Sequence, residues 1–284
     1  MGIILGVDIG GSTTKIVGLR EDGSLHGTLR VEANDQLTSL YGAVGNYLNT
    51  HRLFLTDVSR IVLTGVGSSY VDQPIYGVPT EKVTEFNAIG CGGLSLSGRE
   101  NAIVVSLGTG TAFVWASQQE IRHLGGSGVG GGALFSLCSL LTGARSMEQV
   151  EKLLREGDLS RVDLSVGDLS RDASFSLGSD VTAANFGKVA EGASHGDLAL
   201  GVVNMVMQVI GTISYFASLS CGTKTVILTG TLTALPRVRE LLDRVAALYG
   251  LDILIPENAA FAPAIGAALF SLRGGGESVA YPKK

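Results

Sequence analysis

Two short turns rich in glycine, serine and threonine contain residue types that suit the binding of phosphate. The first reads Asp8-Ile9-Gly10-Gly11-Ser12-Thr13-Thr14-Lys15, and the second reads Gly108-Thr109-Gly110-Thr111. Because glycine lacks a Cβ, backbone N–H groups in such turns can converge on phosphate oxygens, while hydroxyls and a lysine add donors and positive charge. For the first turn alone, a tight hairpin whose glycines only solve the turn is the alternative interpretation.

The first turn differs from a Walker P-loop. The order GxxxxGKS or GxxxxGKT is absent, and residues 15–19 continue as a strand instead of a helix. Asp8 ends an apolar strand, where one carboxylate can hold a phosphate-bound Mg²⁺ directly or through water. The second turn offers the same donors from another part of the chain, so we expect the two turns to clamp one polyphosphate.

A third glycine-rich run, residues 125–132, matches the pattern GxGxxG from Gly126 to Gly131 and precedes a predicted helix. A dinucleotide-binding turn shows this pattern, but it belongs in the first βα turn of a parallel sheet and is weak evidence alone. The alternative is a helix N-terminus that receives the charge of a nucleotide or substrate.

Glu85 is the candidate general base. A carboxylate flanked by apolar residues can have a raised pKa and can accept the proton of a substrate hydroxyl. The alternative is an acidic residue in the first turn of a helix capped by Thr84. Arg122 and His123 precede the third glycine run, and either could bind a substrate carboxylate or form a surface ion pair.

The elements that carry these residues are predicted to form two similar halves, because each phosphate turn joins two apolar strands. In the first half we expect strands at 3–9, 14–20, 25–31 and 60–64, a helix at 36–49 and a partly helical segment at 81–96. In the second half we expect strands at 101–107, 112–116, 225–229 and 252–255, helices at 134–141, 199–220, 235–249 and 261–271, and loop-rich sequence to about 180. The tail from Gly274 is expected to be flexible.

The composition is that of a folded protein with a buried sheet. The chain has 284 residues, of which 45% are hydrophobic and 17% charged, and its length permits either one large domain or two lobes. A net charge of -5 without a basic run argues against nucleic acid as a partner. The N-terminus lacks the features of a signal peptide, and polar residues interrupt even the long 199–220 segment. We therefore expect a cytoplasmic protein without a membrane span.

Three cysteines, Cys91, Cys138 and Cys221, are odd in number and scattered along the chain. They indicate neither a disulfide framework nor a CxxC metal site, and we expect them to be reduced and buried.

In combination, these motifs resemble those of the acetate and sugar kinase, chaperone-ATPase and actin superfamily. Over nearly the whole chain they resemble those of the type II pantothenate kinases. The segments that carry the resemblance are DIGGSTTK (8–15), TEFNA (84–88), SLGTGT (106–111), GGSGVGGG (125–132), TAANFG (182–187) and ENAAF (257–261). The first and third are general to the superfamily, whereas the glutamate motif, the glycine run and the TAANFG run in this order are more specific.

The resemblance implies an α/β fold with two actin-like, ribonuclease H-like lobes, in which mixed sheets flanked by helices enclose a central nucleotide cleft. Residues 1–98 would form the N-terminal lobe and 99–284 the C-terminal lobe, with the last helix able to pack back on the first lobe. The implied reaction transfers the γ-phosphoryl group of MgATP to the primary hydroxyl of pantothenate, which opens coenzyme A synthesis. The resemblance also implies a homodimer to which the 199–220 helix contributes.

The resemblance also implies roles for single residues. Glu85 would be the base and Asp8 would position Mg²⁺. The nucleotide would be held by Asp8, Gly10, Gly11, Ser12, Thr13, Thr14, Lys15, Gly108, Thr109, Gly110, Gly131, Gly132, Gly230 and Thr231. The substrate would be held by Glu85, Thr109, Thr111, Ala183 and either Arg122 or His123.

The chain departs from the family at one implied substrate residue. The family has an arginine two residues before the first glycine of the glycine run, and this chain has His123 there. Three interpretations stay open: Arg122 reaches the substrate from a shifted strand, His123 contacts it, or the substrate differs.

Three other functions are compatible with the sequence. One is a different kinase of the same fold, such as one that acts on an amino sugar. Another is an ATP-driven activator protein that shares an iron–sulfur cluster between subunits, for which Cys91 would be a ligand. The third is an ATP-binding switch or actin relative without catalysis.

Overall fold

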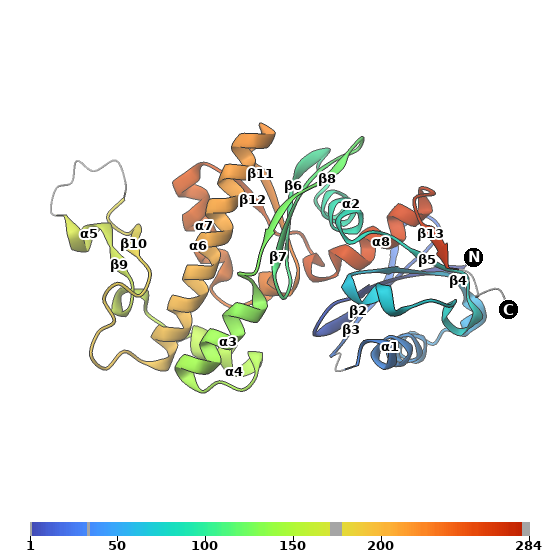
Figure 1. The fold of residues 1–284 in the computed structure, drawn as a ribbon, viewed down its shortest axis with the longest axis horizontal. Coiled ribbons are helices and arrows are strands. Elements are labelled where there is room, and N and C mark those ends of the chain that lie inside the picture. The colour runs from blue at the N-terminus through green and yellow to red at the C-terminus, as the bar shows by residue number, and fades with distance from the viewer. Residues whose placement is uncertain (1, 33–34, 171–177, 280–284) are drawn as a thin grey trace.

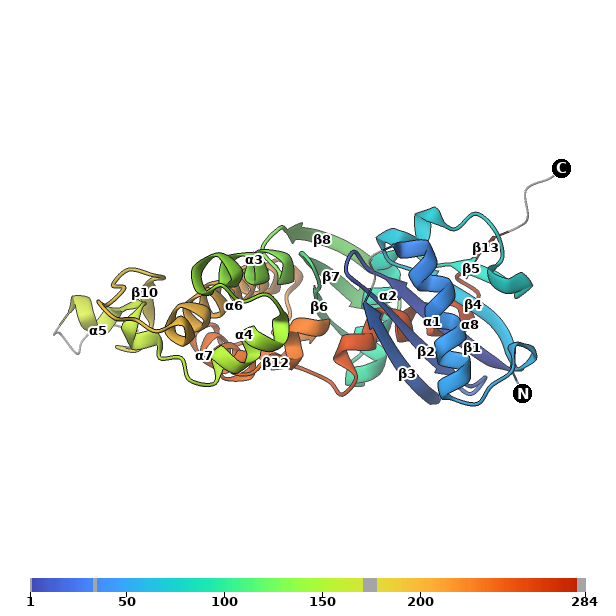
Figure 2. The same cartoon turned by 90° about the horizontal axis from the view of Figure 1, so that it is seen from below.

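Two mixed β-sheets, each flanked by helices, form the framework of the protein (Figure 1, Figure 2). The computed structural model describes residues 2–32, 35–170 and 178–279. Between the two sheets lie helices α2 (Glu85–Ser97) and α8 (Ala262–Leu272), which pack against each other.

The first sheet has the strand order β13-β5-β4-β1-β2-β3. Strands β1, β2 and β3 form an antiparallel meander, while β4 runs parallel to β1 and β5 runs parallel to β4. The strand bounds are β1 (Ile3–Ile9), β2 (Thr13–Leu19), β3 (Leu25–Glu32), β4 (Val58–Thr64), β5 (Thr80–Lys82) and β13 (Glu277–Val279). Helix α1 (Gln36–Thr50) covers one face of this sheet, and α8 covers the other.

The second sheet repeats this arrangement with the order β12-β11-β6-β7-β8. Its meander is β6 (Asn101–Leu107), β7 (Thr111–Ser117) and β8 (Ile121–Ser127), and its parallel strands are β11 (Thr225–Thr229) and β12 (Asp252–Leu254). The strand order β5-β4-β1-β2-β3 of the first sheet therefore recurs in the second, as the repeated strand, turn and strand pattern of the sequence predicted.

The remaining helices lie mostly on the second half of the chain. They are α3 (Gly131–Thr142), α4 (Met147–Leu154), α5 (Val166–Leu169), α6 (His195–Cys221) and α7 (Val238–Tyr249). A two-stranded sheet of β9 (Leu164–Ser165) and β10 (Thr182–Ala184) lies beyond α6, at the end of the molecule opposite the first sheet (Figure 1). Short 3₁₀ turns follow several strands, among them η2 (Val66–Tyr70) after β4 and η5 (Thr231–Ala234) after β11.

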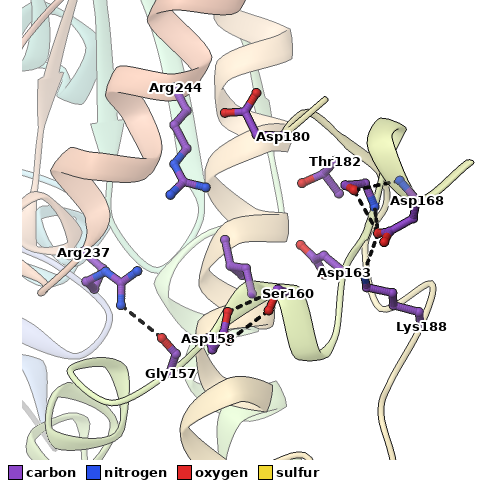
Figure 3. A pocket seen from close by; sticks show the side chains of 12 residues that line it. Gly157, Asp158, Ser160, Asp163, Asp168, Asp180, Thr182, Lys188, Arg237 and Arg244 are labelled. Atoms are coloured by element: carbon purple, nitrogen blue, oxygen red, sulfur yellow. Dashed lines mark hydrogen bonds and ion pairs between the residues drawn. The ribbon is translucent and has the colours of Figure 1, made fainter. Parts of the chain in front are cut away.

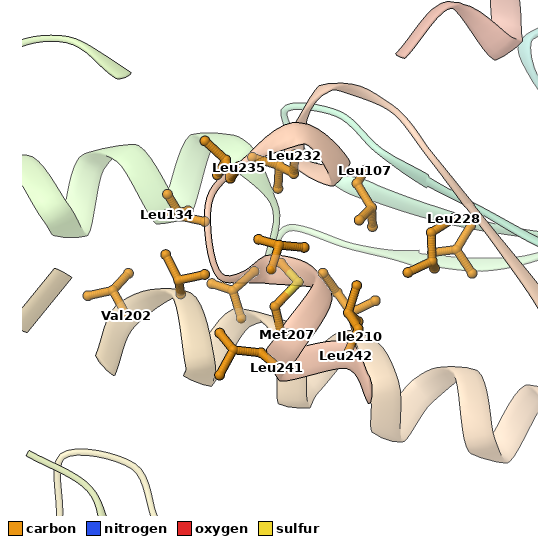
Figure 4. Close-up of a cluster of buried hydrophobic side chains, with 14 of the residues drawn as sticks. Leu107, Leu134, Val202, Met207, Ile210, Leu228, Leu232, Leu235, Leu241 and Leu242 are labelled. Atoms are coloured by element: carbon orange, nitrogen blue, oxygen red, sulfur yellow. The ribbon is translucent and has the colours of Figure 1, made fainter. Parts of the chain in front are cut away.

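Helix α6 is the core helix of the second half. Its side chains Val202, Met207 and Ile210 pack with leucines from β6, β11, α3 and α7 in one buried cluster (Figure 4). Each fully buried side chain of this size contributes about 1.5–3 kcal/mol relative to exposure. By length and hydropathy α6 could cross a membrane, which corrects our expectation that no segment qualifies. However, 61% of the apolar 18-residue stretch of α6 that meets this criterion is buried inside the protein, as in a core helix.

The crossing of α2 and α8 depends on two glycines. Gly92 of α2 and Gly266 of α8 lie against the partner helix so closely that a Cβ at either position would overlap a carbonyl oxygen, of Ala262 and Ala88 respectively. The two helices therefore meet backbone to backbone, and this contact connects the two sheets.

The structure contains several elements that were not predicted, among them β5 and β10. Strand β8 was not predicted, because its second half consists of the first residues of the glycine run. The segment between 142 and 180, expected to be loop-rich, contains α4, β9 and α5. The tail was expected to be flexible from Gly274, but β13 pairs with β5; residues 280–284 lie outside the described part.

Candidate active site

A cleft of about 400 Å³ lies where the two phosphate turns face each other, and most of the predicted site residues line it. The β1–β2 turn and the ends of β1 and β2 form one wall, and the β6–β7 turn forms the other. The predicted residues that line it are Asp8, Gly10, Gly11, Ser12, Thr13, Lys15, Glu85, Gly108, Thr109, Gly110, Thr111, His123, Gly230 and Thr231. The structure thus brings together residues more than 200 positions apart in the sequence.

Asp8 and Lys15 form a nearly buried ion pair in the floor of the cleft. They are register partners on β1 and β2, and Lys15 Nζ lies 3.1 Å from Asp8 Oδ2. On the other side of β1, Thr64 is the parallel partner of Asp8, so its side chain points to the same face of the sheet. The Thr64 hydroxyl is buried without a hydrogen-bond partner. Gly65 follows with φ 82°, and a Cβ there would lie 2.7 Å from Asp8 Oδ1.

The two turns present backbone donors in different ways. In the first turn, Gly10 N–H donates to Thr13 O, while no acceptor within the described part of the chain takes the Gly11 and Ser12 N–H groups. These two amides belong to residues that line the cleft and are free to donate to a ligand there. The second turn is braced from behind, because Gly131 N–H donates to Gly108 O at 2.8 Å and Gly132 N–H donates to Thr109 O at 2.9 Å. Gly131 and Gly132 thus fix the shape of the turn, and their own N–H groups are already hydrogen-bonded to it.

Glu85 lies at the first position of α2 and points into the cleft. The hydroxyl of Thr84, which precedes it, makes no capping hydrogen bond, so α2 begins without the cap that the structural interpretation required. Burial raises the pKa of Glu85, and the carboxylate of Asp8 raises it further, while Lys15 and His123 lower it. A half-buried carboxylate with a raised pKa is a stronger base than an exposed one.

The register of β8 sets which of the two side chains, Arg122 or His123, faces the cleft. Arg122 pairs with Trp115 and His123 pairs with Val114, after which a bulge at position 124 shifts the pairing. Val114 belongs to the cluster on the α2 side of the sheet, whereas Trp115 packs on the α6 side. His123 therefore faces α2 and the cleft. Arg122 faces the opposite side, where its Nε lies 3.4 Å from an exposed Glu120 carboxylate.

Five predicted site residues do not line the cleft: Gly131 and Gly132, which brace the second turn, and Thr14, Arg122 and Ala183. Thr14 is fully buried and is not among the lining residues, because it alternates with Thr13 and Lys15 along β2. Arg122 points away, as described. Ala183 is exposed on β10, beyond α6 and at a distance from the cleft of its own chain (Figure 1).

Several lining residues were not predicted from the sequence. Gly65 and Val66 line the cleft because they follow β4, which is parallel to β1 and ends at the same edge of the sheet. The others are Phe86, Ser106, Ala112, Gly126, Ser127 and Pro263. For Phe86, Ser106 and Ala112 the available signal was their position next to a predicted residue or near the end of a predicted strand. The cleft-lining Gly126 and Ser127 belong to an antiparallel strand, which excludes the dinucleotide-binding interpretation of the glycine run.

A second cavity of about 380 Å³ lies between the β9–β10 sheet and α7 (Figure 3). Its basic side chains have acidic partners: Lys188 with Asp168, and Arg237 and Arg244 with Glu240. Asp163, nearly buried, accepts hydrogen bonds from Asn204 Nδ2 at 2.6 Å, Phe186 N at 2.9 Å and Asn185 Nδ2 at 3.3 Å. These contacts hold the TAANFG run against α6.

The described residues contain no group of three or more His, Cys, Asp or Glu side chains that could hold a metal ion. Cys91 is buried in α2, and burial raises the pKa of its thiol. The cleft offers only two carboxylates among the described residues, those of Asp8 and Glu85, so a metal there would also need a ligand that brings its own oxygens.

Sequence comparison finds relatives of this chain. The family model described as Fumble matches residues 101–240. The type II pantothenate kinase of Staphylococcus epidermidis is 28% identical over 274 residues, which cover 93% of this chain and 98% of the relative. That of Staphylococcus aureus is 29% identical over 276 residues, with 93% and 97% covered. The chain is similar to the type II pantothenate kinases. The similarity extends over both sheets and the cleft between them.

Solved structures share the fold of this chain. The (R)-2-hydroxyglutaryl-CoA dehydratase component A of Acidaminococcus fermentans has a TM-score of 0.68 at 14% identity, over 97% of this chain and 99% of that one. A ROK family glucokinase from Streptomyces griseus, solved with glucose and AMPPNP, has a TM-score of 0.61 at 16% identity. The match covers 95% of this chain and 99% of the glucokinase. At these identities the likeness concerns the fold alone, and it confirms the predicted two-lobed, actin-like α/β architecture.

Proposed function

We propose that the protein transfers the γ-phosphoryl group of ATP to the primary hydroxyl of pantothenate, which yields 4'-phosphopantothenate and ADP. This reaction opens coenzyme A synthesis. The observation that carries the proposal is the nearly full-length match to type II pantothenate kinases, in a chain whose Glu85 faces two phosphate-type turns across one cleft.

In the proposed reaction, Glu85 accepts the proton of the pantothenate hydroxyl while its oxygen forms a bond to the γ-phosphorus. The bond between that phosphorus and the β–γ bridging oxygen breaks, and ADP leaves. Phosphoryl transfer depends mainly on positioning and on stabilising charge. The free amides of Gly11 and Ser12, the hydroxyls of the turns and the Lys15 ammonium are suited to these tasks.

The cleft fits a magnesium ion bound together with nucleotide. Mg²⁺ is usually bound through one or two carboxylates plus substrate phosphates and water. Asp8 offers one carboxylate, and the buried, unpartnered Thr64 hydroxyl on the same face can bond to a metal-bound water. When bound there, Mg²⁺ would offset the charge of the phosphates.

The nucleotide is proposed to lie along both turns and against Gly230 and Thr231, which border the cleft at the end of β11. Gly131 and Gly132 would act through the turn that they brace. Thr111 would act likewise, because its hydroxyl donates to Val129 O at 2.8 Å and so ties β7 to the glycine run.

We also propose that residues 1–98 and 99–284 are the two lobes, with α8 packed on the sheet of the first. Exposed Phe216 and Leu219, three residues apart on α6, provide apolar side chains suited to contact with a second copy of the chain. In such a homodimer, Ala183 could contact pantothenate only in the cleft of the partner. A cytoplasmic location, where ATP is available, suits this function.

The match to type II pantothenate kinases favours this function over an amino sugar kinase, a non-catalytic ATP-binding switch and an iron–sulfur activator. The burial of Cys91 also argues against an iron–sulfur activator. Its thiol does not reach the surface, where a second subunit could share a cluster.

The proposed function is tested by measuring ADP release with ATP, Mg²⁺ and one of three additions: pantothenate, an amino sugar, or none. We expect release only with pantothenate, with 4'-phosphopantothenate as the product by mass spectrometry. Release with the amino sugar alone, or equal release without an acceptor, would contradict it.

A further inference from the structure

The aromatic ring of Phe86 and the imidazole of His123 lie flat against each other at the cleft. Their ring centroids are 3.9 Å apart and their planes differ by 11°. Phe86 directly follows Glu85 at the start of α2, whereas His123 projects from β8 of the second sheet. The stack therefore bridges the element that carries the proposed base and the opposite wall of the cleft.

His123 is the basic side chain best placed to bind an anionic group of the acceptor. Four titratable side chains line the cleft: Asp8, Lys15, Glu85 and His123. Lys15 is paired with Asp8, and Arg122 lies on the other face of the sheet. A flat aromatic surface attracts a protonated imidazole and also fixes the plane in which the ring nitrogens point.

Phe86 is exposed more than a core residue requires, with 36% of its surface accessible. Its ring covers one face of the imidazole, and both residues line the cleft. Glu85 is close enough to His123 for the charge of the imidazole to lower the pKa of the carboxyl. Because Phe86 directly follows Glu85 in α2, a group that binds to the stacked imidazole lies near the base.

We propose that Phe86 and His123 act as one stacked unit that recognises the carboxylate end of the acceptor. His123 contacts the carboxylate, and Phe86 is a positioning residue that acts through His123. This inference rests on the proposed function, because it assumes that pantothenate, which carries both a hydroxyl and a carboxylate, is the acceptor.

The test replaces Phe86 by leucine, which keeps apolar volume but removes the flat aromatic face. For Phe86→Leu we expect the KM for pantothenate to rise roughly three- to tenfold, the range of an aromatic pair, with kcat and the KM for ATP within twofold of wild type. Phe86→Trp should restore the KM, since it again offers an aromatic face. Phe54→Leu, at an exposed phenylalanine far from the cleft, is the matched control and should change nothing.

A double-mutant cycle separates positioning from independent contact. If Phe86 acts through His123, adding Phe86→Leu to His123→Ala raises the pantothenate KM no further. In a protein that retains Phe86, His123→Arg should keep a low KM for pantothenate, because a guanidinium also stacks on an aromatic face. If the increases in pantothenate KM multiply in the double variant, or if Phe86→Leu lowers only kcat, the inference is overturned. Pantothenate turnover by wild type would still leave the proposed function intact. No turnover of pantothenate by wild type would instead refute the proposed function itself.

Discussion

The same substitution, glycine to alanine, is predicted to have opposite effects at two helical positions. At Gly42 in α1 the added Cβ meets nothing within 4 Å, whereas at Gly266 in α8 it overlaps the Ala88 carbonyl oxygen and lies 2.5 Å from Gly92 N. In a helix interior, alanine is about 0.8–1 kcal/mol more favourable than glycine. Gly42→Ala should therefore stabilise the protein by up to about 1 kcal/mol.

At Gly266 the same helix-propensity gain is opposed by a steric cost. Overpacking a well-packed site typically costs about 1–3 kcal/mol, and here both neighbours are backbone atoms of another helix, which cannot rotate away. We expect Gly266→Ala to reduce the free energy of unfolding by about 2 kcal/mol or more, and to reduce turnover because α2 carries Glu85. Chemical denaturation of both variants measures the two signs. A Gly266→Ala protein as stable as Gly42→Ala would refute the close helix crossing.

Three further predictions concern the site and its support. Glu85 must be ionised to act as a base and its pKa is raised, so turnover should fall on acidification at a higher pH than for an ordinary glutamate. Lys15→Met removes a charge that lowers this pKa. In that variant the acid limb of the kcat–pH profile, measured at saturating ATP, should move to still higher pH. His123→Ala should raise the KM for pantothenate about tenfold or more, while Arg122→Ala, on the other face of β8, changes it less than twofold in the same steady-state assay. Asp163→Ala leaves the buried Asn204 amide and the Phe186 N–H without their acceptor, and should cost about 1–3 kcal/mol in denaturation, whereas exposed Asp72→Ala should cost nothing measurable.

Much of the fold was accessible from the sequence because its strands are strongly apolar. Strands β1 and β6 begin and end where the apolar runs do, and the two phosphate turns connect the strands that were predicted. Strand β8 escaped prediction because glycines have low β propensity and because its bulge at position 124 interrupts any alternation. Strand β13 depends on an edge of β5 that exists only in the folded protein.

The candidate site was predictable in composition but not in orientation. The turns and Glu85 could be identified from residue types, and their meeting in one cleft followed from the resemblance. Whether Arg122 or His123 faces the cleft depends on a one-residue register, which the bulge sets and which reverses every side chain beyond it. Thr14, by contrast, could have been assigned to the far face from the alternation of β2 alone.

The most direct test of the central claim compares wild type with Glu85→Gln in pantothenate-dependent ADP release, with ATP binding measured on the same samples. The account predicts that the variant binds ATP as wild type does but loses turnover by about 10²–10⁴-fold, the usual contribution of a general base. Unchanged turnover in Glu85→Gln would contradict the role of this carboxylate and with it the proposed mechanism.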